Sequence, residues 1–300
     1  MPNTKYKAAI IKTGPALGLL LICFFIYLPA MQADFAVDDW HVVKDNERIT
    51  DIRFIPDYFT SDVWSNTTDD LTHNFKGYNI YRPLFLIVLN LGHHLWGESA
   101  TGFHSLNIFF HFVNSLLVFY LISNLIPNRS ATPAFFGATI FAVHPVHIES
   151  AAWISGITDP LVAMFLLGNF LVYRHYLTTG KRAHAALALF LFACGLLSKE
   201  VAVFYPMILL ISDWISGKLA ARRYLPYLAL IAVYFVARAN AMGTSVEMDS
   251  YDLTKFPVLI EYVFRYMNLL VLPWPSNFHF HSPPAPNLFA LISGGIASLI

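Results

Sequence analysis

Charge is scarce in this chain of 300 residues. Lys, Arg, Asp and Glu make up only 13% of it, whereas soluble domains carry about 25%. The 19 Lys and Arg residues balance the 19 Asp and Glu residues, so no excess of positive charge favours nucleic acid as a partner. Hydrophobic residues form 56% and aromatic residues 16%, which suits a bilayer and its interfaces. The composition predicts an all-helical, multi-pass integral membrane protein.

Cysteine and several catalytic motifs are scarce or missing as well. The two cysteines, Cys23 and Cys194, both lie inside apolar runs, so we expect neither a disulfide framework nor a redox role. No Gly-x-Ser-x-Gly elbow, phosphate-binding glycine loop or His-Glu-x-x-His motif occurs in the sequence. These absences disfavour a serine protease, a nucleotide-driven pump and a helical zinc site.

Apolar runs and flanking charges predict the topology. The run Gly14 to Ala33 is long enough to span a bilayer and follows Lys5, Lys7 and Lys12, so we expect a retained anchor with a cytoplasmic N-terminus. Residues 33 to 81 carry ten acidic and four basic residues, which predicts an outer location.

Two basic clusters predict cytoplasmic turns: Arg174/Lys181/Arg182 and Lys218/Arg222/Arg223. The apolar stretches 183 to 198 and 201 to 216 between them must cross and return. The stretch 159 to 173 then runs inward. This parity puts three charged motifs on one outer face: Asp38-Asp39, the run from His144 to Asp159, and Lys199-Glu200.

These motifs can share one face of the membrane only if one short apolar segment does not cross it. Leu84 to Trp96 is too short for an ordinary span and contains Asn90, His93 and His94, so we expect an interfacial helix. A descending helix over 103 to 126 and an ascending one over 133 to 146 follow. We read Phe256 to Leu272 as an interfacial helix of a second outer loop. The whole would have about seven or eight spans, with two extra true spans as the alternative.

The charged residues at the outer face have the chemistry of a transferase. Asp38 or Asp39, partly desolvated at a membrane face, could accept a proton from an acceptor hydroxyl, and Asp38 is the first choice. Three cations could hold a phosphate: Arg82, Lys199 and Arg265. Four further residues would shape the pocket: His144, His147, Glu149 and Asp159. The alternative is that these side chains have no catalytic role and only extend from helix ends toward the membrane surface.

Two other readings stay open. His144, His147 and Glu149 are sound metal ligands, but Pro145 interrupts the backbone between the histidines, so we expect no cofactor and keep a divalent metal only as the alternative. Intramembrane carboxylates and histidines also serve as proton relays, so a proton-coupled transporter or flippase for a polyprenyl-linked lipid is the alternative function.

The order of motifs resembles the membrane half of the transmembrane and tetratricopeptide-repeat O-mannosyltransferases, over most of residues 34 to 215. The residues that carry the resemblance are Asp38-Asp39-Trp40, Asp45-Asn46, Ser61-Asp62-Val63-Trp64, Tyr81-Arg82-Pro83-Leu84, Phe103-His104-Ser105-Leu106-Asn107 with His111, Phe141-Ala142-Val143-His144-Pro145-Val146-His147-Ile148-Glu149, Gly156 with Asp159, and Ser198-Lys199-Glu200. The His-Pro-Val-His run is the most specific of these.

The resemblance implies a GT-C fold, a sugar donor linked to polyprenyl phosphate, and an acidic base in the first outer loop, which corresponds to Asp38-Asp39. It also adds His104 and Glu200 to the predicted pocket. Where that family has a small residue, Arg, Ala and an acid, this chain reads Gly156-Ile157-Thr158-Asp159, so the arginine is missing. The family's repeats would follow the membrane part, and we expect further chain after residue 300.

The sequence therefore predicts one GT-C-like membrane glycosyltransferase module over residues 1–300, with a first outer loop at about 33–102 and a second at about 240–287. It would move mannose or another hexose from a polyprenyl-phosphate carrier to a hydroxyl on a protein or glycan. Donor, acceptor and lipid bilayer are the expected partners. The bacterial inner membrane is the favoured location and the endoplasmic reticulum membrane the alternative.

Overall fold

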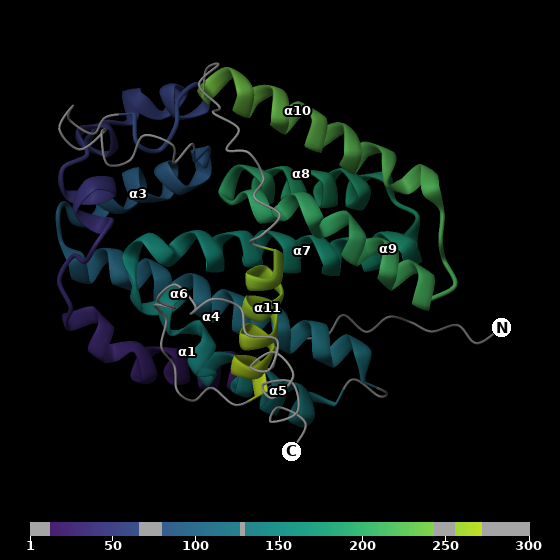
Figure 1. The fold of residues 1–300 in the computed structure, drawn as a ribbon. Helices are drawn as coiled ribbons and strands as arrows, with labels where there is room; N and C mark the ends of the chain where they lie inside the picture. Colours follow the sequence, from purple (N-terminus) through teal and green to yellow (C-terminus); the bar gives the residue numbers. More distant parts are fainter. Residues whose placement is uncertain (1–12, 66–79, 127–129, 243–255, 272–300) are drawn as a thin grey trace.

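The structure, a computed structural model, describes residues 13–65, 80–126, 130–242 and 256–271. Every regular element in these ranges is a helix, which confirms the all-helical fold (Figure 1). The α-helices are α1 (Thr13–Tyr27), α3 (Pro83–Trp96), α4 (Ala100–Leu125), α5 (Ala131–Val143), α6 (Ile148–Ala152), α7 (Thr158–Thr179), α8 (Arg182–Ser198), α9 (Tyr205–Ile215), α10 (Leu225–Met242) and α11 (Phe256–Val271). Short 3₁₀ or π turns join them: η1 (Leu28–Gln32), η2 (Trp40–Lys44), η3 (Glu47–Thr50), η4 (Ile52–Phe59), η6 (Pro145–His147), η7 (Ile154–Ile157), η8 (Glu200–Phe204) and η9 (Ala221–Arg223).

Several helices are long and apolar enough to cross a membrane. Within the described ranges there are four, at Thr13–Gln32, Ala100–Leu125, Ile154–Thr179 and Ala221–Met242, and a fifth if α5 and the bent segment after it form one span. A multi-pass membrane protein is thereby confirmed. The larger number expected from sequence counted shorter helices as spans, since α8 has 17 residues and α9 has 11.

The bend after α5 has a local cause. Proline disfavours helical dihedral angles in the residue before it, and His144, which precedes Pro145, is extended with ψ 126°. The chain therefore turns by 50° between α5 and the segment Pro145–Ala152. The ascending helix predicted over 133 to 146 ends at Val143 for this reason.

The helices place two chemically different ends about 33 Å apart, the length of the 22-residue helix α7. At one end the start of α7 meets the end of α8, where Lys199 pairs with Asp159. At the other end Arg174 of α7 donates to Ser216, 2.9 Å away, after α9. We call the first the acidic end, because its loop of residues 33–65 carries eight acidic and three basic residues. We call the second the basic end, because residues 174–182 and 213–223 carry six Lys or Arg and one Asp.

Helix α3 stays at the acidic end. Arg82, just before its first residue, pairs with Glu200, and Glu98, just after its last turn, pairs with Lys44. In its middle, Asn90 donates to the carbonyl oxygen of Asp51 at 3.1 Å. Both ends of α3 are thus tied to the same end of the bundle; that this segment does not cross the membrane stays a prediction.

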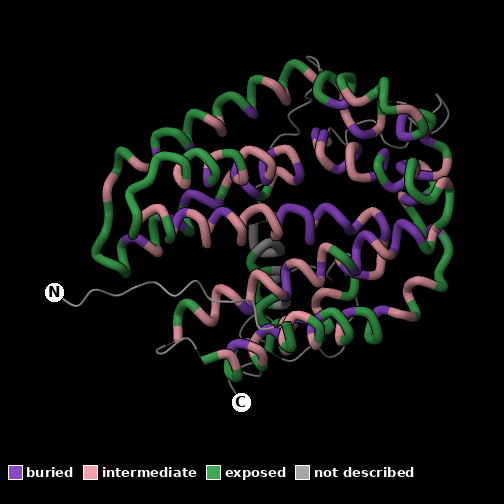
Figure 2. Tube along the Cα trace, turned by 180° about the vertical axis from the view of Figure 1, so that it is seen from behind, coloured by how far each residue is buried: buried purple, intermediate pink, exposed green. Residues whose placement is uncertain are grey.

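Helix α7 is the central element. The apolar stretch of its span is 50% buried, against 11% for the span that contains α10. Figure 2 shows the buried residues gathered on the helices at the middle of the bundle. Two buried amides of α4 fix the chain on either side of the start of α7, because Asn107 donates to the Ser150 carbonyl at 3.2 Å and Asn114 donates to the Pro160 carbonyl at 2.7 Å. This segment supplies most of the site described next.

Candidate active site

The loop after α1 presents two adjacent carboxylates from a strained backbone. Val37 has a φ of +50°, a conformation that a β-branched residue rarely adopts. Strain of this kind costs about 1–3 kcal/mol and persists only where the surroundings enforce it. Asp38 and Asp39 follow directly, so their positions are set by the contacts that hold this loop.

Asp39 is the anchor of that loop. Its side chain is 0% exposed. One oxygen, Oδ1, accepts hydrogen bonds from the backbone N–H of Ser155 at 2.8 Å and from its hydroxyl at 2.5 Å. The other, Oδ2, accepts from the Ala36 N–H at 3.0 Å. Burial raises the pKa of Asp39, and the bonds from Ser155 and Ala36 offset only part of that rise. Because it is enclosed and already accepts three hydrogen bonds, Asp39 is poorly placed to take a substrate proton.

Asp38 differs from its neighbour in being half-buried rather than enclosed. Its backbone carbonyl accepts from the N–H groups of His41 and Val42, at 3.0 and 2.9 Å, which starts η2 and fixes the residue. Burial raises the pKa of its carboxyl, and the nearby His41 only partly offsets this. A fixed, reachable carboxylate of raised pKa has the properties of a general base.

His104 lies beneath the loop, on the first turns of α4. It is 2% exposed and close enough to Asp39 for the two charges to interact. The structure therefore brings the buried His104 and Asp39 together with the partly buried Ser155. Ser155 was not predicted, since a serine between Ile154 and Gly156 carries no distinctive signal.

Two of the three predicted phosphate-binding cations, Arg82 and Lys199, are each paired with a carboxylate. Arg82 donates from Nε and Nη2 to the two oxygens of Glu200, at 3.0 and 2.6 Å. Burial raises the pKa of Glu200, but the hydrogen bonds and charge of Arg82 outweigh burial and hold it below its usual value. Lys199 pairs with Asp159. The carboxylate of each pair is more exposed than its cation: Glu200 is 42% exposed against 16% for Arg82, and Asp159 46% against 24% for Lys199.

One short segment connects both groups. Ser155 holds Asp39, and Asp159, four residues later, holds Lys199. Gly156 between them is required by space, because a Cβ there would lie 2.6 Å from the Glu149 carbonyl oxygen. Ile157, at the position where the resembling family has arginine, is 1% exposed and packs in the core instead.

The two histidines of the His-Pro-Val-His run are partly exposed and lie beside other rings. His147 lies against Phe141, with ring centroids 4.4 Å apart, and against His111 of α4 at 5.3 Å. His111 is two turns, about 10 Å, along α4 from His104. His144 accepts a hydrogen bond from the Val146 N–H at 3.2 Å, which caps the bend. Glu149 is exposed at the start of α6.

The part of the chain that the structure describes contains no candidate metal site. No three His, Cys, Asp or Glu side chains there converge closely enough to hold an ion. Arg265 lies in α11, but its side chain is outside the described residues, so its role stays a prediction.

Sequence reasoning also missed two buried charged residues. Arg48 is 5% exposed and donates to the hydroxyls of Ser61 and Ser65, each at 2.5 Å, which closes the first loop on itself. In a loop rich in acidic residues, the sequence alone suggests that such an arginine is exposed to solvent, which is why its burial was missed. Asp213 is 0% exposed near the basic end of α9. A lone acid in the apolar run Ile211-Ser212-Asp213-Trp214-Ile215 was a signal that could have been used.

Comparisons with known proteins find sequence relatives of this chain. The chain is 28% identical over 186 residues to the protein O-mannosyl-transferase Tmtc1 of Drosophila melanogaster, covering 62% of this chain and 21% of that one. It is 28% identical over 229 residues to TMTC1 of Mus musculus, covering 72% and 24% of the two chains. It is 31% identical over 169 residues to TMTC2 of Mus musculus, covering 56% and 19%.

The aligned part is thus between 19% and 24% of these relatives' lengths. No family model matches the chain, and no solved structure matches it. The resemblance read from the motifs is nevertheless confirmed by the relatives: the chain is similar in sequence to the TMTC protein O-mannosyl-transferases.

Proposed function

We propose that this chain is the membrane module of a glycosyltransferase that moves a hexose, with mannose as first choice, from a polyprenyl-phosphate carrier to a hydroxyl on a protein or glycan. The observation that carries the proposal is that two adjacent acids differ in burial and in their contacts. Asp39 is enclosed and fixes the loop, while Asp38 is half-buried, reachable and raised in pKa. The relatives are named protein O-mannosyl-transferases, which supports the same reaction class.

The reaction follows from these residues. Asp38 accepts the proton of the acceptor hydroxyl, and the hydroxyl oxygen forms a bond to the anomeric carbon of the sugar. The bond from that carbon to the phosphate oxygen breaks, and polyprenyl phosphate leaves with the electron pair. The developing phosphate charge needs a cation, and Lys199 and Arg82, whose partners Asp159 and Glu200 lie at the same end of the bundle, are the candidates.

Both cations are already paired with carboxylates, which affects how a donor phosphate can bind. A phosphate arriving at Lys199 or Arg82 must share the cation with Asp159 or Glu200 or displace it. The carboxylates are the more exposed members of the pairs, so they can move toward solvent while the cations stay. In this proposal the two ion pairs keep the cations in place before the donor binds.

The proposed orientation puts the acidic end at the outer or lumenal face and the basic end in the cytoplasm. The support is the charge contrast, since cytoplasmic turns carry excess Lys and Arg. The bacterial inner membrane remains our prediction for the location. The animal relatives make the endoplasmic reticulum membrane the alternative to test.

Transfer of radiolabelled mannose from mannosyl polyprenyl phosphate, with the purified chain in detergent, tests the proposal. We expect label in a new glycosidic bond on a hydroxyl-rich protein acceptor, and none with an Asp38→Asn/Asp39→Asn double variant. Transfer by the double variant at the wild-type rate would contradict the proposal. Lipid movement in vesicles without any new glycosidic bond would identify a transporter instead.

A further inference from the structure

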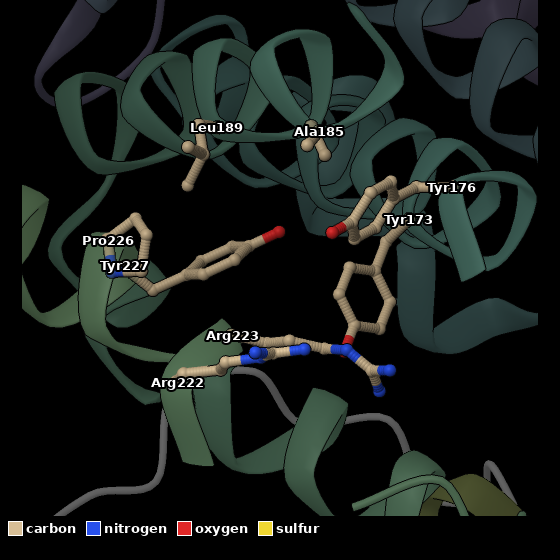
Figure 3. Close-up of a pocket in the computed structure, with 9 residues that line it drawn as sticks. Tyr173, Tyr176, Ala185, Leu189, Arg222, Arg223, Pro226 and Tyr227 are labelled. Atoms are coloured by element: carbon tan, nitrogen blue, oxygen red, sulfur yellow. The ribbon is translucent and has the colours of Figure 1, made fainter. Parts of the chain in front are cut away.

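The basic end contains a cavity, far from the carboxylates of the acidic end. Its volume is about 290 Å³, well above the ~10–15 Å³ that a single water requires. Figure 3 shows the side chains that surround it, which come from the last turns of α7, the first half of α8, the turn η9 and the start of α10. The lining residues are Tyr173, Tyr176, Ala185, Ala188, Leu189, Arg222, Arg223, Pro226 and Tyr227.

One wall of this cavity is fixed by a buried acid. Asp213 accepts hydrogen bonds from the hydroxyls of Tyr173 at 2.5 Å and Tyr224 at 2.9 Å. Arg223 lies 3.6 Å from the same carboxylate oxygen and also donates to the Lys218 carbonyl at 2.6 Å. The single acid of this end is thus used to position tyrosines and one arginine.

Two other lining groups remain available for a ligand. Arg222 has no ion-pair or hydrogen-bond partner among the described residues, and neither does the hydroxyl of Tyr176. In Figure 3 the hydroxyls of Tyr176 and Tyr227 point toward one another into the cavity, and the arginine side chains lie along the facing wall. Arginine and phenol donors converging on one space suit a multi-oxygen anion.

The surroundings favour an anion that carries an apolar part. Six Lys or Arg residues and one Asp occur in the two turns that form this end. Across from the arginines, the wall from α8 is apolar, with Ala185 and Leu189. Basic pockets between membrane helices bind lipid head groups in this way, with the phosphate at the cations and the glycerol or acyl part against the helix.

We propose that the cavity between α7, α8 and the start of α10 binds a phosphate group, presented by an anionic phospholipid of the leaflet at the basic end. Arg222 and Tyr176 donate to the phosphate, and Arg223 contributes charge while it stays on Asp213. The site is separate from sugar transfer, because the length of α7 lies between it and Asp159. It would attach this end of the bundle to anionic lipid.

Native mass spectrometry of the full chain, taken from vesicles of phosphatidylcholine with phosphatidylglycerol, tests this site. We expect one phosphatidylglycerol to stay bound to the wild type. Arg222→Ala and Tyr176→Phe should each lower its retention at least about fivefold, the effect of losing one charge-assisted hydrogen bond. Neither residue supports the fold through a hydrogen bond or ion pair within the described residues, so both variants should fold.

Arg182→Ala is the matched control, because Arg182 is exposed at the same end but does not line the cavity. Its retention should equal that of the wild type. Equal loss in Arg182→Ala and Arg222→Ala would mean diffuse charge attraction, and unchanged retention in Arg222→Ala would remove the site; either result overturns the proposal. Inorganic phosphate separates the sources: displacement of the lipid shows that the phosphate group alone suffices, and retention in excess phosphate shows that the lipid is required.

Discussion

At the acidic end each cation that lines the candidate active site is held by its own carboxylate, Arg82 by Glu200 and Lys199 by Asp159. At the basic end the relation is reversed, since one carboxylate, Asp213, collects two tyrosines and an arginine, and Arg222 is left over. The first arrangement leaves a reachable carboxylate, Asp38, in surplus; the second leaves a cation in surplus. A carboxylate in surplus can take a proton, and a cation in surplus can hold an anion.

The largest expected effect tests whether the two ends lie on opposite sides of a membrane. In a background with Cys23→Ala and Cys194→Ala, cysteines at Glu47 and Lys218, both exposed, report the two ends. Glu47→Cys should react with an impermeant thiol reagent on intact cells, and Lys218→Cys only after permeabilisation. Lys181→Cys, in the other turn of the basic end, serves as the control and should behave like Lys218→Cys. Labelling of all three cysteines from outside would show that the two ends do not lie on opposite sides of the membrane.

Gly156→Ala should have the next largest effect, and only at the acidic end. A Cβ at Gly156 would lie 2.6 Å from the Glu149 carbonyl oxygen, so the backbone beside Ser155 must move. We expect a loss of about 1–3 kcal/mol in the free energy of unfolding, as for other overpacked sites, and a fall in transfer because Ser155 holds Asp39.

Gly168→Ala in α7 is the matched control, because its Cβ would meet Leu191 at an ordinary 3.6 Å. It should be neutral or slightly stabilising in thermal unfolding. If both variants behave alike, the close approach at Gly156 does not hold the site.

Tyr224→Phe should weaken the basic end by a smaller amount. It removes one hydrogen bond to the buried carboxylate of Asp213, which keeps Tyr173 and Arg223. Hydrogen bonds to charged groups contribute about 1.5–3 kcal/mol, and we expect the lower end of that range. Tyr120→Phe is the control, since the Tyr120 hydroxyl has no hydrogen-bond partner in the described structure. Equal unfolding midpoints for the two variants would mean that Asp213 does not organise this end.

The smallest expected effect concerns the pH dependence of stability. The pKa of Asp38 is raised in the folded protein by burial, so its contribution to stability is full below the unfolded pKa and is lost as the pH rises through the folded pKa. At neutral pH the half-buried, charged carboxylate of Asp38 therefore lowers the stability of the folded protein. Asp38→Asn has no charge there, so its unfolding midpoint should lie slightly above that of the wild type. The difference should vanish near the ordinary Asp pKa of 3.8. A variant that is less stable than the wild type at neutral pH would show that Asp38 is structural.

The sequence predicted the helices well because their boundaries follow from local signals. The short helix after Arg82 and the turns that follow α7 and α9 could be located from the sequence, whereas the side of the membrane on which they lie stays a prediction. The end of α5 was placed three residues too late, at 146 rather than Val143. The effect of Pro145 on His144 was local chemistry that could have been applied.

The roles of the acids could not be read in the same way. Asp38 and Asp39 are equivalent in sequence, and only the contact between Asp39 and Ser155, 116 residues away, separates them. The pairing of Arg82 with Glu200 spans 118 residues and depends on how α3 lies against α8. Contacts at such separations are set by the packing of the whole bundle, which no single motif encodes.

The comparison of Asp38→Asn with Asp39→Asn tests the central claim most directly. Transfer from mannosyl polyprenyl phosphate and thermal unfolding are measured on both variants and on the wild type. Asp38→Asn should remain folded and bind the donor while transfer falls about 100-fold or more. Asp39→Asn should instead lower the unfolding midpoint, because an amide cannot accept all the hydrogen bonds from Ser155 and Ala36. Near wild-type transfer by Asp38→Asn, or a fully stable and inactive Asp39→Asn, would contradict the assignment of Asp38 as base and Asp39 as anchor.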